Sequence, residues 1–397
     1  MKNSQDKRKN KVSKQEKIFK QKKPKRRLNR LGKVVVSTIA VVFALLLVVR
    51  AFISNKINRI NIVDDSDFTK VATTSTKEDK DKQPEESKNQ ASEKSLYELN
   101  AALRKDLPDG VLYDEDIFNI LLIGVDSRDK DNLQTNSDSM MLASLDLKHK
   151  KIHLISLLRD SYVYIPGYGY HKLNAANALG GPPLLLETIR ENYRIEVEHY
   201  ALVNMFDVVK IVDLLDGVKI NIKDYEIEEL NRAIKSYNGL IGEKHPEDFI
   251  YSSGVHTLNG RQALAYGRIR KVGNSDYERT ERQRRIIGSL FKKMQSLDLL
   301  EVNSLINNVL PLINTNLKEN EMLSFIPQLG NILSSELIPD RIPIDYSFEE
   351  TYIDGLACLV VDFNKNISYL AENIYNMSDA EIAEFFDNSV EMTEPTY

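Results

Sequence analysis

Three apolar runs, each bounded by charged residues, constrain the fold of this chain more than any other feature. They cover residues 117–125, 140–147 and 152–158, and a short segment, residues 146–151, joins the last two. Apolar runs of this length, bounded by polar residues, predict buried strands. If the short segment is a hairpin turn, the strands form an antiparallel meander, so the end of the first, the start of the second and the end of the third meet at one edge.

Charged side chains gather at this predicted edge. Asp126 and Arg128 follow the first strand, Asp138 precedes the second, and Arg159 and Asp160 follow the third. Carboxylates placed together suit a divalent metal that prefers oxygen ligands, and an arginine beside them suits a phosphate held by that metal. The sequence therefore predicts a phosphate-processing site.

A second group of cations lies further along the chain. Arg268 and Arg270 are two residues apart after a short helix predicted over 261–266, and in extended geometry they would point the same way and hold one phosphate together. A long helix is predicted over 277–297, and its first turns carry three side chains at helical spacing, Arg279, Arg282 and Gln283. Ordinary helix ion pairs, Glu278 with Arg282 and Glu281 with Arg285, are the alternative interpretation.

The polar segment at residues 171–181 has two open interpretations. Lys172 and Asn174 could belong to a loop that closes over the site, or the segment could simply lead into a helix. His171 is a weak candidate base, because a lone histidine is more often structural or exposed.

An apolar stretch near the N-terminus predicts a membrane anchor. Residues 34–49 are apolar apart from Ser37 and Thr38, and residues 1–33 hold fifteen Lys and Arg against two acidic residues. The stretch is long enough to span a bilayer, and the positive-inside rule places residues 1–33 in the cytoplasm and the rest outside. A cleaved signal peptide is the alternative, but residues 50–54 offer a poor cleavage site.

Charge and cysteine content exclude some classes of function. The chain has 54 basic and 58 acidic residues, so removing the fifteen and two of residues 1–33 leaves 39 against 56, a net charge of −17. An acidic domain is not expected to bind nucleic acid, which needs a basic surface. The single Cys358 rules out an intrachain disulfide and is expected to be buried and inert.

The element order predicts one large domain. We expect a basic tail over 1–33, a transmembrane helix over 34–54, a linker with a short helix over 55–113, a catalytic domain over 114–375 and an acidic, solvated tail over 376–397. After the meander the pattern predicts helices at 182–193 and 205–215, strands at 196–203, 218–222 and 359–362, and a loop from 223 to 257. The predicted fold class is α/β (α+β), with a mainly antiparallel central sheet flanked by helices.

Several motifs, in order along the whole domain, resemble the LytR-CpsA-Psr family. They are Ile-Gly-Val-Asp-Ser-Arg at 123–128, Ser-Asp-Ser-Met-Met-Leu at 137–142, Arg-Asp-Ser-Tyr-Val at 159–163, Lys-Leu-Asn-Ala-Ala at 172–176 and Leu-Asn-Gly-Arg-Gln-Ala-Leu-Ala-Tyr-Gly-Arg-Ile-Arg at 258–270, followed by Asp276, Arg279, Arg282 and Gln283. The resemblance implies a cell-envelope phosphotransferase of Gram-positive bacteria. Such an enzyme moves a glycopolymer, for example capsule or teichoic acid, from undecaprenyl pyrophosphate to peptidoglycan with the help of Mg²⁺.

The resemblance also implies roles for individual residues. Asp126 and Asp138 would bind Mg²⁺, and the pyrophosphate would be held by Arg128, Arg159, Lys172, Arg268, Arg270, Arg279, Arg282 and Gln283. Asp138, Arg159 and Asp160 would be catalytic, with the general base left open between Asp138 and Asp160. Many members have an arginine where this chain has Asn136, so one phosphate contact is missing unless Arg128 replaces it.

Two other functions use the same residues. A hydrolase would attack the lipid pyrophosphate with water in place of the acceptor hydroxyl. A non-catalytic envelope regulator or polysaccharide-binding scaffold would bind the lipid-linked polymer without turnover.

Overall fold

The computed structural model describes residues 61–71, 98–100, 102–127, 129, 132–273, 275–297, 301, 305 and 308–387. The chain divides into two units, Met1–Ile53 and Ser54–Tyr397, and all described residues belong to the second. The predicted cytoplasmic tail and transmembrane helix, residues 1–33 and 34–54, lie outside the described residues. In the described ranges, no helix combines the length and the apolar character that crossing a membrane requires.

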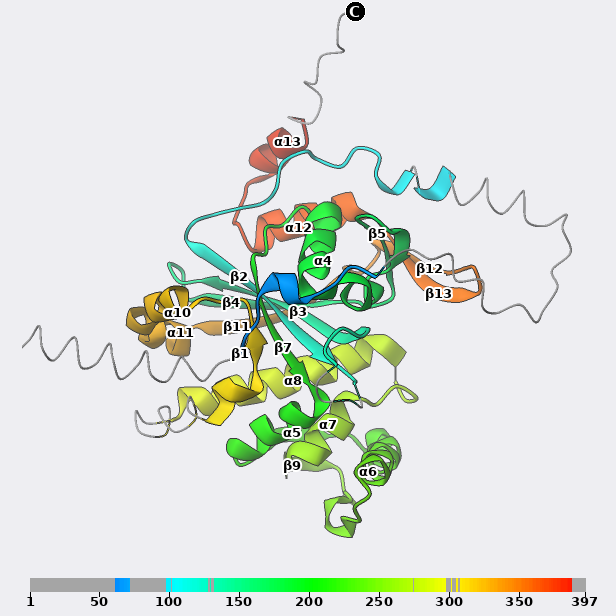
Figure 1. The fold of residues 1–397 in the computed structure, drawn as a ribbon, viewed down its shortest axis with the longest axis vertical. Helices are drawn as coiled ribbons and strands as arrows, with labels where there is room; N and C mark the ends of the chain where they lie inside the picture. The colour runs from blue at the N-terminus through cyan, green and yellow to red at the C-terminus, as the bar shows by residue number, and fades with distance from the viewer. Residues whose placement is uncertain are drawn as a thin grey trace, which may run out of the picture. The chain divides into compact units, whose positions relative to one another are not determined.

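The predicted meander forms the middle of a seven-stranded sheet (Figure 1). Its strands are β2 (Ile117–Val125), β3 (Ser137–Asp146) and β4 (Lys151–Leu157), paired antiparallel, with a turn at residues 147–150 between the last two. The sheet order is β1-β10-β7-β2-β3-β4-β11, with outer strands β1 (Asn61–Ile62), β10 (Asn314–Thr315), β7 (His199–Asn204) and β11 (Glu336–Ile342).

The sheet is mixed rather than mainly antiparallel, which corrects one part of the predicted fold class. Within the described sheet, three of the six strand pairings are parallel: β1 with β10, β2 with β7, and β4 with β11. Parallel neighbours need a long crossover connection, and here helices supply it. The α4 helix (Ala175–Tyr193) precedes β7, and α10 (Glu319–Phe325) and α11 (Leu329–Ser334) precede β11. The broader prediction of a central sheet flanked by helices is confirmed.

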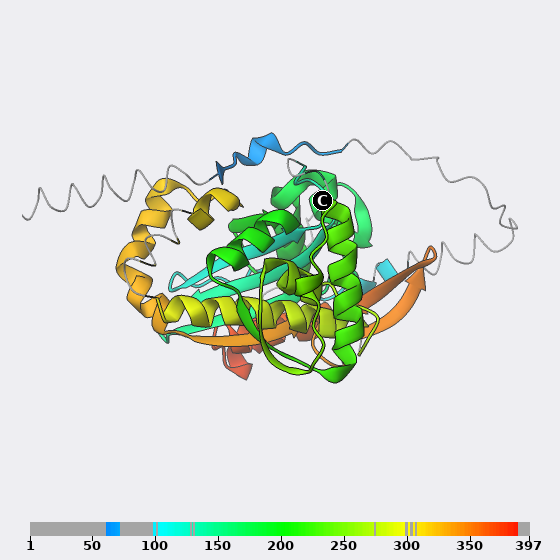
Figure 2. The ribbon, with the colours of Figure 1, turned by 90° about the horizontal axis from the view of Figure 1, so that it is seen from below.

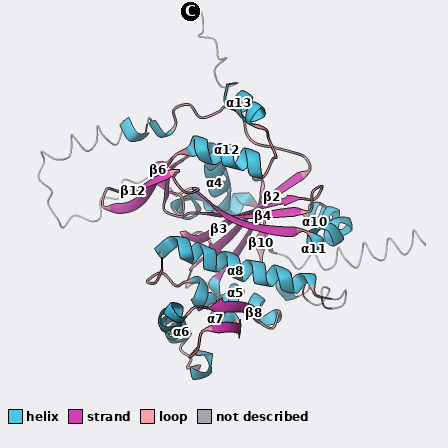
Figure 3. Cartoon of the chain, turned by 180° about the vertical axis from the view of Figure 1, so that it is seen from behind, coloured by secondary structure: helices cyan, strands magenta, loops and turns pink. Residues whose placement is uncertain are grey.

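Helices cover both faces of this sheet (Figures 1 and 3). Along β3, Leu142 packs in the cluster that includes α4 and α12 (Phe363–Asn373), whereas Met141 packs in a cluster that includes Ile287 of α8 (Ser275–Gln295). Successive residues of a strand point to opposite faces, so a strand buried on both sides reads as the continuous apolar run seen in the sequence.

A second sheet extends from the end of the meander. Its order is β12-β13-β5-β6, formed by β5 (Ser161–Ile165), β6 (Gly169–Lys172), β12 (Phe348–Ile353) and β13 (Leu356–Val361). Cys358 on β13 is buried, and burial raises the pKa of its thiol. The thiol is therefore protonated at neutral pH and unreactive, as predicted.

A smaller subdomain packs against α8 with a core of its own (Figure 2). It contains α5 (Met205–Leu214), β8 (Val218–Ile222), α6 (Ile227–Ile241), β9 (Gly254–Leu258) and α7 (Gly260–Gly267). The loop predicted over 223–257 is wrong, because α6 occupies much of it. Leu230 and Ile234 are the buried face of that helix, at the spacing of four that an amphipathic helix requires.

The predicted linker and tail both need correction. Residues 61–71 attach to the domain: β1 pairs with β10, and Val71 N donates to Leu179 O at 2.9 Å. Phe68 packs at a kink in α4, where Gly181 has φ 69° and an added Cβ would lie 2.4 Å from the Phe68 ring. At the other end, α13 (Asp379–Asp387) turns apolar side chains, among them Phe385, onto the main core. Only residues 388–397 of the predicted tail lie outside the described chain.

Candidate functional site

A β-bulge places Asp138 at the predicted edge. Gly124 pairs with Ser139 and Val125 pairs with Ser137, so Asp138 is an extra residue with no partner on β2. An extra residue bends the strand and redirects its side chain. Gly124 allows the close approach, because an added Cβ there would lie 3.1 Å from Ser139 Cβ.

Three arginines converge on one oxygen of Asp138. Arg159 donates from Nη1 to Oδ1, Arg270 Nη2 lies 3.3 Å from the same atom, and Arg279 Nη1 lies 3.7 Å from it. These arginines come from the turn after β4, the segment after α7 and the first turns of α8. Residues 132 positions apart in the chain therefore meet at one carboxylate.

Arg159 connects Asp138 to two further carboxylates. Its Nε lies 3.7 Å from Asp160 Oδ2 and 3.6 Å from Asp276 Oδ1. Asp276 also accepts from Arg279 Nη2 at 2.9 Å. Asp276 therefore holds two of the three arginines in place, a role that the sequence analysis did not assign. Its spacing of three from Arg279 was the available signal.

Lys172 pairs with Asp160 beside this group. The Nζ to Oδ1 distance is 2.9 Å, and both side chains are about three-quarters buried. Lys172 ends β6, and Asn174 then bonds through its backbone to Arg159 and to Ser137, at 3.2 Å each. The segment is thus a helix entry rather than a closing loop, yet it brings Lys172 into the site. His171 is exposed and its Nε2 lies 3.1 Å from Tyr168 O, so it has a structural contact instead.

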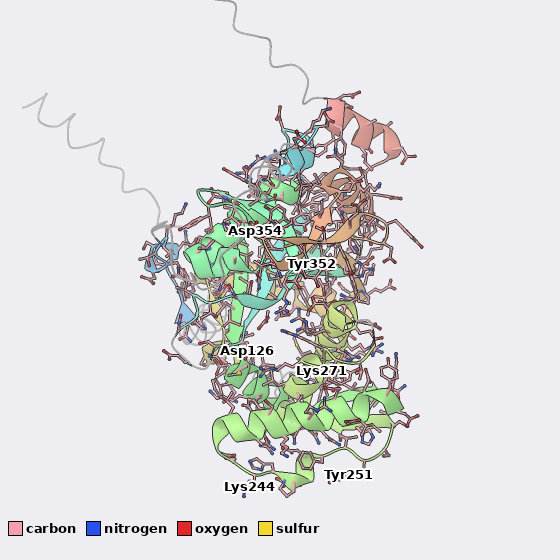
Figure 4. The ribbon with its side chains drawn as sticks, turned by 90° about the vertical axis from the view of Figure 1, so that its right-hand side faces the viewer. Asp126, Lys244, Tyr251, Lys271, Tyr352 and Asp354 are labelled. Atoms are coloured by element: carbon pink, nitrogen blue, oxygen red, sulfur yellow. The ribbon has the colours of Figure 1, made fainter. Side chains whose placement is uncertain are left out.

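Arg268 pairs with Asp126 at 2.6 Å, from Nη2 to Oδ2. The predicted extended geometry of Arg268 and Arg270 is wrong, because Arg268 is the C-cap of α7 with helical φ −103° and ψ −3°. The two guanidinium groups nevertheless reach neighbouring carboxylates, Asp126 and Asp138. They are the most exposed arginines of the site, with 41% and 45% of their side chains exposed. Figure 4 shows Asp126 between the part that carries Tyr352 and the subdomain that carries Tyr251.

Arg279 is the most deeply buried cation of the site, with 2% of its side chain exposed. Burial lowers the pKa of its guanidinium to about 10, which still leaves it charged at neutral pH. The Nε atoms of Arg279 and Arg159 are both buried and have no hydrogen-bond acceptor among the described residues.

Two predicted ligands of the pyrophosphate lie outside this group. Arg282 is buried and fully engaged: Nε donates to Glu226 Oε1 at 2.8 Å, Nη2 to Glu278 Oε2 at 2.6 Å and Nη1 to Ile269 O at 3.2 Å. Arg282 pairs with Glu278, and Arg285 pairs with Glu281. The alternative interpretation of these residues as ion pairs of the helix is therefore correct. Gln283 donates to Gly267 O at 3.3 Å and so supports the backbone next to Arg268. Arg128 lies outside the described residues, and Asn136 is exposed.

The site resulting from these contacts, which we call the cation cluster, contains five cations and four carboxylates. The members are Arg159, Lys172, Arg268, Arg270, Arg279, Asp126, Asp138, Asp160 and Asp276. No group of three or more metal-binding side chains occurs among the described residues. Mg²⁺ commonly takes one or two carboxylates and completes its coordination with water and substrate phosphates, so the carboxylates of Asp126 and Asp138 are ligands of the kind that this ion takes.

Comparison with known proteins identifies the family. The model of the LytR_cpsA_psr family matches residues 66–373. The chain therefore belongs to the LytR-CpsA-Psr family, and the resemblance seen in the motifs is confirmed.

Individual relatives cover most of the folded part. The regulatory protein MsrR of Staphylococcus aureus is 30% identical over 254 residues, 63% of this chain and 71% of MsrR. The polyisoprenyl-teichoic acid–peptidoglycan teichoic acid transferase TagT of Bacillus subtilis is 31% identical over 229 residues, 56% of this chain and 67% of TagT. A structure of TagT bound to LI-WTA superposes with a TM-score of 0.53 at 25% identity, over 69% of this chain and 96% of that one.

Proposed function

We propose that this protein is a membrane-anchored phosphotransferase that moves a cell-wall glycopolymer from a polyprenyl pyrophosphate carrier to peptidoglycan. The observation that carries the proposal is the convergence of Arg159, Arg270 and Arg279 on Asp138, at an edge where the side chain of Arg270 is 45% exposed. The name of the relative TagT states the same type of reaction for that protein.

The cation cluster suits the chemistry of a pyrophosphate. Its oxygens are negative and repel a hydroxyl nucleophile, so catalysis consists largely of neutralising charge and aligning the reactants. In the proposed step the acceptor hydroxyl oxygen bonds to the phosphorus that carries the polymer. The bond from that phosphorus to the bridging oxygen breaks, and polyprenyl phosphate leaves with that oxygen. Arginine suits the site because it stays charged and donates in pairs to phosphate oxygens.

Asp126 and Asp138 would hold Mg²⁺ in this reaction. When bound, the ion supplies further positive charge for the pyrophosphate oxygens. Both carboxylates now accept from arginines that a bound pyrophosphate would attract, so ligand binding frees oxygen atoms for the metal.

Asp160 is the better candidate for the base that accepts the hydroxyl proton. Three guanidinium groups occupy Asp138 Oδ1, whereas Asp160 has one close partner, Lys172, and Arg159 Nε only at 3.7 Å. A base must be within hydrogen-bond reach of the proton it takes, and Asp160 is about one-quarter exposed.

The predicted anchor at residues 34–54 would keep the domain close to a lipid-bound donor. Peptidoglycan, the lipid-linked polysaccharide and the membrane are the proposed partners, with the domain outside the cell membrane of a Gram-positive bacterium. The word regulatory in the name of MsrR favours a second candidate, a non-catalytic envelope regulator.

One experiment separates these functions. The full-length chain in detergent micelles is incubated with a lipid-pyrophosphate-linked saccharide and peptidoglycan oligomers, with Mg²⁺ or with a chelator, and the products are followed by mass spectrometry. We expect a phosphodiester conjugate that depends on Mg²⁺. Free phosphorylated saccharide without conjugate would establish the hydrolase, and binding without any product would establish the regulator.

A further inference from the structure

A large groove lies along α8, on the side away from Arg279. Its volume is about 1350 Å³, and it is lined by α8, by the antiparallel strand pair β8 and β9, and by β11. Glu281, Gly288 and Lys292 line it, and these positions lie about half a turn round the helix from Arg279. Figure 3 shows α8 between the central sheet and strand β8. The groove is therefore separate from the cation cluster, although both use α8.

The groove is lined by a net positive charge, whereas the rest of the extracytoplasmic chain is predicted to be acidic. Six basic residues line it against two acidic ones: Lys219, Lys223, Arg284, Arg285, Lys292 and Lys293 against Glu281 and Glu336. The lining thus has a formal charge of +4, while residues 34–397 together have −17. A concave surface lined by one sign of charge concentrates ligands of the other sign.

Several of these cations have capacity for a ligand. Lys219 and Lys292 are exposed, and no ion pair in the described part of the chain includes either of them. Arg284 adds positive charge to the wall, although its Nη1 is buried. Arg285 and Lys293 are partly neutralised, by Glu281 and by Asp216 at 3.8 Å.

The walls suit a polar chain rather than a peptide strand. Both β8 and β11 are the outer strands of their described sheets, so each presents an edge to the groove. Pro339 in β11 lacks an N–H and disfavours pairing with an added strand. Hydroxyl and amide side chains, among them Asn221, Ser289 and Gln295, can bond to sugar hydroxyls.

We infer that this groove binds the polyanionic chain of the donor glycopolymer, at repeats remote from its pyrophosphate. The inference rests on the proposed function and adds to it the class of substrate: a polymer with an anionic group, such as a phosphodiester, in successive repeats. A row of cations matches a row of like negative charges better than it matches peptidoglycan, whose stem peptides carry charges of both signs. Arg279 and Lys292 are thirteen residues apart on α8, about 20 Å along the axis. Only a donor several repeats long would reach both sites.

The test compares two double variants of the full-length chain in lipid nanodiscs. Lys219→Glu/Lys292→Glu reverses two exposed charges in the groove. Lys235→Glu/Lys244→Glu makes the same change in net charge at exposed positions of the same subdomain outside it; Figure 4 shows Lys244 at its far end. Binding of a defined poly(glycerol phosphate) chain, with dextran as the neutral probe, is measured at several salt concentrations.

We expect the groove variant to bind the polyanion about tenfold more weakly at low salt and with a smaller salt dependence, and the control to change by less than about twofold. In the transfer assay, KM for a long anionic donor should rise in the groove variant by a similar factor. Transfer from a donor with one or two sugars should be unchanged, because such a donor does not reach the groove.

Equal weakening in both double variants would overturn the inference, since it would show a general effect of net charge. Loss of peptidoglycan binding with polyanion binding intact would also overturn it, because the acceptor would then occupy the groove. Failure of the proposed function has a different result: no transfer from long or short donors in the wild type, with polyanion binding still sensitive to the groove variant alone.

Discussion

Arg282 and Glu226 form a fully buried ion pair, with Arg282 Nε 2.8 Å from Glu226 Oε1 and no more than 1% of either side chain exposed. The pair joins α8 to the segment that precedes α6, fifty-six residues away. It therefore fastens the subdomain to the helix that also carries Arg279.

Replacing Arg282 should damage folding rather than chemistry. Arg282→Ala leaves Glu226 buried and unpaired, which costs about 3–5 kcal/mol of unfolding free energy. The control is Lys148→Ala, which breaks only the exposed pair with Asp116 and should cost no more than about 1 kcal/mol. Urea unfolding of the Ser54–Tyr397 unit measures both. Equal costs would show that burial does not govern the Arg282 pair.

Removing the proposed metal ligands should abolish transfer. Asp126→Ala and Asp138→Ala are each expected to lower the rate of conjugate formation by about 100-fold or more, because charge neutralisation is the main source of catalysis here. Asp116→Ala, a more exposed aspartate paired with Lys148, is the control and should keep the wild-type rate. Retained transfer in both site variants would rule out the proposed metal role.

Asp276 should act by positioning two arginines. Asp276→Asn keeps the shape but weakens the contacts to Arg159 and Arg279, so we expect kcat to fall about 10- to 100-fold. KM for the lipid donor should change much less, since Arg268 and Arg270 remain. Steady-state transfer kinetics separate the two constants. Asp345→Asn, at an exposed pair with Arg341, is the matched control.

The kink of α4 should depend on glycine at position 181. Gly181→Ala adds strain at φ 69° and a collision with Phe68, and we expect a loss of about 1–3 kcal/mol in unfolding free energy. Gly239→Ala, inside α6 with no atom near the new Cβ, should instead add about 0.5–1 kcal/mol. Thermal unfolding of both variants checks the signs, and a stable Gly181→Ala variant would contradict the packing of Phe68.

His153 should make the domain less stable in mild acid. Burial lowers the pKa of the His153 imidazole, and Lys151 lowers it further. Because the folded-state pKa lies below the unfolded value, the unfolded chain takes up a proton first. Stability is therefore constant above about pH 6.5 and falls as the pH drops from there toward the folded-state pKa. His153→Gln should flatten this slope.

His245 is the control for His153, because its pKa shifts in the opposite direction. Hydrogen bonds to Glu243 and Glu247 raise the pKa of His245, so its contribution has the opposite sign: it is present below the unfolded pKa and lost as the pH rises through the folded one. Urea unfolding at several pH values distinguishes the two histidines. An unchanged slope in His153→Gln would refute the assignment.

Local sequence pattern predicted the meander and the convergence of Asp138 with Arg159, because both follow from strands that are adjacent in the chain. The spacing of Leu230 and Ile234 could also have predicted the amphipathic helix α6, which the sequence analysis missed. The buried pairing of Arg282 could not be predicted from the sequence, because no residue near Arg282 in the chain indicates that Glu226 lies beside it. The parallel pairing of β4 with β11 likewise joins segments about 180 residues apart, which local periodicity does not encode.

The attachment of residues 61–71 has a consequence for the segment that follows them. The chain leaves the domain at Val71 and is attached to it again at Asn100, whose carbonyl accepts from Tyr170 at 2.6 Å. The described residues on either side of this segment are therefore held on the same unit. The entropy of loop closure rises only slowly with length, by about 0.6 kcal/mol for each doubling. Insertions, deletions or an affinity tag in this segment should accordingly be tolerated, which makes it the natural place to label the protein without disturbing its site.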